Sequence, residues 1–243
     1  MKTYCLEVSG DFACFTRPEM KVERVSYDVM TPSAARAVFE AILWKPAIHW
    51  QVSKIEVLNS IHWINLRRNE VGCVASTHNV ETAMKSGTGQ LGLYVEDERQ
   101  QRAGLFLRDV KYRIYASFEL RDPSFHKPNF PHLSKRTVNV DESDVETEPN
   151  PTVKFMTMFE RRAAKGQCVN QPYLGCREFA ADFKLVESGT AQANPIAETR
   201  ELGYMLYDLD YRNAADPKPR FFRAQLMSGV VNVPAWDSEE VRG

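Results

Sequence analysis

The chain has 243 residues, a formal net charge of −1, 43% hydrophobic residues and 26% charged residues. This composition is ordinary for a soluble globular protein, and the length suits one large domain or two small ones. No apolar run approaches the roughly 20 residues that a transmembrane helix needs, so we expect no contact with a membrane.

The first two predicted elements are a strand and a helix. Apolar and polar residues alternate over "TYCLEVS", residues 3–9, which is typical of a strand. A helix is predicted to begin after Thr31, because threonine caps helix N-termini well and Pro32 suits the first helical position. The helix must end near Trp44, since Pro46 disfavours the α conformation in the residue before it.

Two further strands and a long polar segment follow. Residues 47–58 alternate, but the apolar phase slips between Val52 and Ile55, which indicates a β-bulge. Residues 60–68 also have a strand pattern. Residues 69–102 are polar and contain "KSGTGQ" at a predicted turn, so we interpret them as an inserted excursion or a hairpin tip.

A strand, a loop and a second helix come next. Residues 110–120 alternate again, and residues 121–149, with four prolines and the acidic run "DESDVETE", are predicted to form a loop. The helix has Asn150 as its N-cap, Pro151 as its first residue and Gly166 at its C-terminal end.

A last strand at residues 179–186 completes the order βαββαβ, which is the pattern of a ferredoxin-like, RRM-like fold. We therefore predict an α+β protein with a ferredoxin-like domain at residues 1–188. Residues 189–243 are predicted to form a small antiparallel β-sheet region, with a two-residue hairpin turn at Ser228-Gly229.

The cysteines and histidines argue against disulfides and protein-bound metal. The number of cysteines is odd, no C-x-x-C occurs, and no histidine pair has H-x-H or H-E-x-x-H spacing. We expect reduced thiols, a cytoplasmic location, no metal and no cofactor. The N-terminus also lacks the basic and apolar regions of a secretory signal.

Lysine and arginine residues are spread along the chain, so a near-neutral protein can still present a basic face to RNA. The RNP signature of the RRM is absent. Gly175, in "QPYLGCREF", suggests a close backbone approach, and Arg177 beside it can reach a phosphate or form a surface Arg–Glu pair. Arg161 and Arg162 can contact RNA or favour the dipole of their own helix.

At these residues the chain resembles the fifth family of CRISPR-associated proteins, in its subtype I-C form, within the repeat-associated RNA-binding (RAMP) superfamily. The resemblance covers nearly the whole chain. Its strongest parts are "GDFACFTRPEMKVERVSYDVMTPSAARAVFEAILWKPAIHW", "RRNEV", "RQQRA", "QPYLGCREF" and "LGYMLYDLD".

The resemblance implies a subunit of the Cascade surveillance complex, in antiviral defence, that holds the 5′ handle of the CRISPR RNA. Its implied partners are the Cascade backbone subunits, the large subunit and target DNA. Members of this subtype commonly cut the precursor RNA without metal, through attack of a ribose 2′-OH on the adjacent phosphate.

The resemblance also implies a catalytic set of a tyrosine before "WKP" and a Lys-His pair that opens the second helix. Lys154 matches the lysine, but Phe155 and Leu43 stand where the histidine and the tyrosine would be. Neither side chain can transfer a proton. His126 or His132 is a possible substitute base, and both can equally be solvated surface residues.

Three hypotheses follow. The chain is a CRISPR-RNA-binding subunit with weakened or lost cleavage, an active endoribonuclease with an altered catalytic set, or a ferredoxin-like protein–protein adaptor without RNA. Besides Lys154, the candidate RNA-binding residues are Arg17, Lys21, Arg24, Arg67, Arg68, Arg161, Arg162 and Arg177.

Overall fold

The computed structural model describes residues 2–89, 91–121, 151–187, 193–213 and 215–243. Most of the predicted loop, with His126, His132 and the predicted cap Asn150, lies outside these residues. The elements are β1 (Tyr4–Ala13), α1 (Pro32–Ile42), β2 (Ile48–Val57), β3 (His62–Val71), α2 (Thr77–Ser86), β4 (Arg99–Leu120), α3 (Pro151–Ala164), β5 (Asp182–Leu185), β6 (Arg200–Asp210), β7 (Lys218–Leu226), β8 (Val230–Asn232) and β9 (Val241–Arg242).

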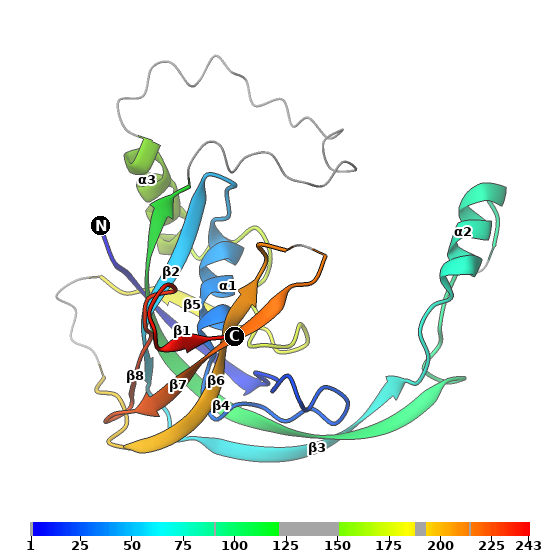
Figure 1. Cartoon of the computed structure of the whole chain (residues 1–243), viewed down its shortest axis with the longest axis horizontal. Coiled ribbons are helices and arrows are strands. Elements are labelled where there is room, and N and C mark those ends of the chain that lie inside the picture. The colour runs from blue at the N-terminus through cyan, green and yellow to red at the C-terminus, as the bar shows by residue number, and fades with distance from the viewer. Residues whose placement is uncertain (1, 90, 122–150, 188–192, 214) are drawn as a thin grey trace.

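In the described residues, two antiparallel sheets make up the β structure (Figure 1). The larger has six strands in the order β5-β1-β4-β2-β8, with β3 paired to the N-terminal half of β4. The smaller has three strands in the order β6-β7-β9. The predicted α+β class is confirmed, with a largely antiparallel sheet and few helices among the described residues.

An aromatic core joins both long helices to the larger sheet. Phe39 of α1 and Phe159 of α3 both contact Trp50 of β2, with ring centroids 4.9 and 4.7 Å apart respectively. Tyr4 of β1 lies 4.8 Å from Phe159. These four side chains are nearly or fully buried, so α1 and α3 are packed against one face of the sheet.

The local signals at α1 and in β2 are confirmed. The Thr31 hydroxyl accepts a hydrogen bond from the Ala34 backbone N–H, and α1 begins at Pro32. The register of β2 against β4 shifts between Val52 and Lys54, where the apolar phase slips.

The predicted hairpin turn is also present. Ser228 and Gly229 have φ values of 47° and 77°, as a type I′ turn requires, and Met227 pairs with Val230 across it. The turn connects two different sheets, because β7 belongs to the smaller sheet and β8 pairs with β2 in the larger one.

The predicted excursion at residues 69–102 is a hairpin whose strands reach farther than expected. Strand β3 continues to Val71 and β4 already starts at Arg99. Helix α2 lies between them, capped by Ser76 and ended by Gly87 in the left-handed region, and was not predicted. Figure 1 shows this arm, made of β3, α2 and the N-terminal half of β4, extending away from the rest of the larger sheet, with α2 at its end.

A half-buried histidine at the start of β2 makes stability depend on pH. Arg121 Nη2 lies 3.1 Å from His49 Nδ1, and because a guanidinium only donates, Nδ1 accepts. Burial, together with the charges of Arg121 and Arg36, lowers the pKa of His49 to about 4, although Asp208 opposes this.

The unfolded chain therefore takes up a proton at His49 near pH 6.5, while the folded chain does not do so until about pH 4. The free energy of unfolding should fall as the pH drops through this window. His49→Gln keeps an acceptor but cannot titrate, so the urea midpoint should change less between pH 7 and pH 5 than in wild type. The exposed His62→Gln is the control, and an unchanged pH dependence in His49→Gln would contradict the assignment.

Candidate nucleic-acid interface

The predicted catalytic positions lie on α3 and at the end of α1. Lys154 is in the first turn of α3 with an exposed side chain. Phe155 is partly buried and packs against the main core. Leu43 is fully buried, and its carbonyl accepts a hydrogen bond of 2.9 Å from Trp50 Nε1. Only Lys154 of the three thus offers an ionisable group to a ligand.

The two arginines at the end of α3 have different surroundings. Arg162 Nη1 donates to the Ile42 carbonyl at 3.0 Å, which ties the end of α3 to the last turn of α1. Arg161 is exposed. Gly166 follows with a φ of +63°, as the predicted helix end requires.

The segment 171–180, here called the Gly175 loop, packs closely on the end of β1. Gly175 has a φ of +82°, and a Cβ atom there would lie 2.0 Å from the Cys14 carbonyl oxygen. The Leu174 carbonyl accepts from the Cys14 N–H at 3.0 Å. The predicted close backbone approach is therefore confirmed. Arg177 is exposed on this loop, while the neighbouring Glu178 is paired with other arginines.

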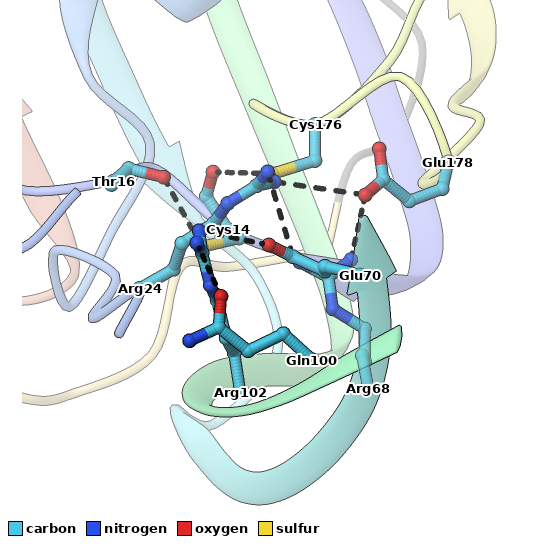
Figure 2. A network of polar contacts seen from close by, with 9 residues as sticks. All are labelled: Cys14, Thr16, Arg24, Arg68, Glu70, Gln100, Arg102, Cys176 and Glu178. Atoms are coloured by element: carbon cyan, nitrogen blue, oxygen red, sulfur yellow. Dashed lines mark hydrogen bonds and ion pairs between the residues drawn. The ribbon is translucent and has the colours of Figure 1, made fainter. Parts of the chain in front are cut away.

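Three arginines, Arg24, Arg68 and Arg102, lie around the carboxylates of Glu70 and Glu178 (Figure 2). We call these five residues the arginine cluster. Arg68 Nη1 donates to Glu178 at 2.6 Å and its Nη2 to Glu70 at 3.0 Å. Arg24 lies 3.7 Å from Glu70 and 3.6 Å from Glu178. Four separate segments of the chain meet at this point: the turn after β1, both strands of the arm, and the Gly175 loop.

Two buried thiols adjoin the cluster. Arg24 Nη1 donates to Cys176 Sγ at 3.3 Å, and Cys14 Sγ lies 3.4 Å from the Thr16 hydroxyl (Figure 2). Hydrogen bonds from Cys14 and Arg24 lower the pKa of Cys176 to about 6, while the same Cys14–Cys176 contact and burial raise the pKa of Cys14. The Cys176 thiol also donates to the Cys14 carbonyl oxygen at 3.8 Å, so its sulfur is held by both Cys14 and Arg24.

Of the candidate RNA-binding residues, the structure brings Arg24 and Arg68 together. Arg17 is elsewhere, paired with Asp28 at 3.2 Å and stacked over the Tyr27 ring at 4.5 Å. Lys21 and Arg67 are exposed. Arg67 points away from the arginine cluster, because successive side chains of a strand face opposite sides of a sheet.

The sequence as a whole is similar to that of a known protein family. A sequence model of the family described as CRISPR-associated protein (Cas_Cas5) matches residues 3–129 and 137–234. The chain belongs to the Cas5 family.

Two curated relatives bear the description "CRISPR pre-crRNA endoribonuclease Cas5d". The protein from Mannheimia succiniciproducens is 44% identical, over 98% of this chain and 97% of its own length. The protein from Thermus thermophilus is 36% identical, over 97% and 93%. The predicted resemblance to the fifth family is confirmed.

A crystal structure of a CRISPR-associated protein superposes with a TM-score of 0.63, covering 100% of this chain and 97% of that one. The two sequences are 21% identical, so this likeness supports the fold alone.

Neither a metal site nor a membrane span is found in the described part of this Cas5 protein. No three His, Cys, Asp or Glu side chains of those residues are grouped so that they could hold a metal ion. The helices of that same part are too short or too polar to cross a bilayer.

Proposed function

We propose that this Cas5 protein binds the 5′ handle of a CRISPR RNA as a subunit of a type I-C Cascade complex, with its own repeat cleavage weakened or lost. The weakened cleavage rests on Leu43, which stands where the family's tyrosine would be. Its side chain is fully buried and cannot transfer a proton to or from the RNA. Family membership supports the first part of the proposal. The partners would be the CRISPR RNA, the Cascade backbone and large subunits, and target DNA in the complex. A cytoplasmic location would go with this role.

We also infer that the larger sheet contains a ferredoxin-like unit. Strands β5-β1-β4-β2 are adjacent in that order, α1 connects β1 to β2, and α3 connects β4 to β5. This order supports the βαββαβ interpretation of residues 1–188. Strands β6, β7 and β9 support a separate β-rich region at residues 189–243, although β8 is added to the larger sheet.

Lys154 would bind an RNA phosphate at the start of α3, where the helix dipole also favours negative charge. Cleavage by a 2′-OH group needs a base to remove its proton and an acid to protonate the leaving oxygen. A positioned acid or base is typically worth about 10²–10⁴-fold. Leucine and phenylalanine supply neither, so Lys154 alone would stabilise the charge of the pentacoordinate phosphorane.

A second candidate function is an active, metal-independent endoribonuclease. The descriptions of both curated relatives favour it. In that case another group must serve as the base. His126 and His132 remain candidates by sequence, and both lie outside the described residues.

A metal-free cleavage assay separates the two candidates. In EDTA, the purified chain should bind its cognate repeat RNA but cut it at least about 10²-fold more slowly than the Mannheimia relative cuts its own repeat. Lys154→Ala should weaken RNA binding about tenfold. Lys165→Ala removes the same charge from an exposed residue just after the end of α3, so it should have little effect. A fast, specific cut with a cyclic phosphate end that is lost in Lys154→Ala would instead establish the endoribonuclease.

A further inference from the structure

Glu178 occupies an exposed anion position between two arginines. Its Oε1 accepts from Arg68 Nη1 at 2.6 Å and lies 3.6 Å from Arg24 Nη1. The Glu178 side chain is 49% exposed, whereas those of Arg24 and Arg68 are 31% and 22% exposed. One carboxylate oxygen thus covers the solvent side of two guanidinium groups that are otherwise largely enclosed.

Both guanidinium groups are held from behind by other partners. Arg68 donates to Glu70 and lies over the Phe106 ring at 4.9 Å. Arg24 donates to Cys176 Sγ and lies 3.7 Å from Glu70. The arginines would therefore keep their positions if Glu178 moved away, and two positive groups would face solvent together.

The charges of the cluster favour exchange of one anion for another. Three guanidinium groups face the carboxylates of Glu70 and Glu178 and the Cys176 sulfur. The two carboxylates offset two of the three positive charges. An anion that replaces the exposed Glu178 carboxylate keeps the balance. Phosphate presents its oxygens to guanidinium groups in the same geometry as carboxylate.

We infer that a phosphodiester of the bound RNA occupies the position between Arg24 and Arg68 that Glu178 fills in the free protein, with Glu178 displaced into solvent. This inference rests on the proposed RNA binding. Glu178 then competes with RNA for the site. It lowers the affinity for any RNA whose phosphate must displace it.

The direction in which one substitution changes the RNA affinity tests the inference. Glu178→Gln removes the competing charge and should lower the Kd for labelled repeat RNA about three- to tenfold at roughly 0.15 M salt. A purely structural ion pair predicts the opposite, because its loss would loosen the Gly175 loop. Arg68→Ala and Arg24→Ala should each raise the Kd about tenfold. In the Glu178→Gln/Arg68→Ala double variant, the gain from glutamine should be lost.

Glu201→Gln is the matched control. Its carboxylate is 51% exposed and paired with Arg223 at 3.3 Å, in the smaller sheet. It removes the same charge from an equally exposed carboxylate that lies outside the arginine cluster, so its Kd should stay within about twofold of wild type. Arg68→Lys keeps the positive charge but lacks the two-pronged donor geometry of a guanidinium group. It replaces Arg68→Ala if the alanine variant fails to fold.

The outcomes separate this inference from the proposed function. If wild type binds repeat RNA and Glu178→Gln binds equally or less tightly, the displacement is wrong while RNA binding stands. The same conclusion holds if Glu201→Gln improves binding as much as Glu178→Gln. If neither wild type nor Glu178→Gln binds the RNA, both the inference and the proposed function are wrong.

Discussion

Phe155→His is expected to raise the rate of repeat-RNA cleavage in EDTA by about 10²-fold, the lower end of the range for a positioned general acid or base. Histidine has an unperturbed pKa near 6.5, and the partial burial of this position and the charge of Lys154 would lower it, so the imidazole would be neutral and able to accept a proton at neutral pH. The lysine would meanwhile stabilise the developing negative charge on the phosphate. The expectation follows from the proposal that the chain lacks only proton transfer, and not RNA binding.

Two further variants make this result interpretable. Phe155→Leu removes the ring without adding an ionisable group, so its cleavage rate should equal that of wild type. Phe155→His combined with Lys154→Ala should lose the gain. If Phe155→His binds the RNA as tightly as wild type but cuts no faster, proton transfer at this position is not what limits cleavage.

Gly175→Ala is expected to lower the free energy of unfolding by about 3 kcal/mol or more. The residue has a φ of +82°, which a side chain disfavours, and its Cβ would lie 2.0 Å from the Cys14 carbonyl oxygen. Because that oxygen belongs to the backbone, it cannot rotate away. The loop must move off β1, and Cys176 and Glu178 must move with it.

Gly166→Ala isolates the contribution of the backbone conformation. Gly166 has a φ of +63°, but nothing lies within 4 Å of the position that a Cβ atom would take, so the cost should be about 1 kcal/mol. Urea unfolding of both variants measures the difference. Equal losses of stability would show that the Cys14 contact is unimportant. RNA affinity should change in Gly175→Ala alone, since only that change disturbs the arginine cluster.

The sequence patterns predicted those parts of the fold whose causes are local. The Thr31-Pro32 cap, the apolar phase slip after Val52 and the Ser228-Gly229 turn each depend on a few adjacent residues. Helix α2 has no buried residue, so it has no core-facing stripe from which a helix could be predicted. Its Met84 is 78% exposed.

The arginine cluster illustrates why a site is harder to predict than an element. Arg24 and Arg68 were candidates by charge alone, but nothing in the sequence links them to Cys176 and Glu178, more than a hundred positions away. Long-range pairing of strands and loops brings them together. The same difficulty affects Arg162, whose contact with the Ile42 carbonyl gives it a structural task that charge did not indicate.

The position of β8 has a consequence for synthesis of the chain. Val230–Asn232 pair with Lys54–Glu56, so the outer edge of β2 gains this partner only after about 170 further residues have been synthesised. At about 5–20 residues per second, this takes on the order of ten seconds or more. An open strand edge can pair with other chains during that time. Faster synthesis of the chain, or a chaperone that covers the open edge of β2, should therefore increase the yield of folded protein.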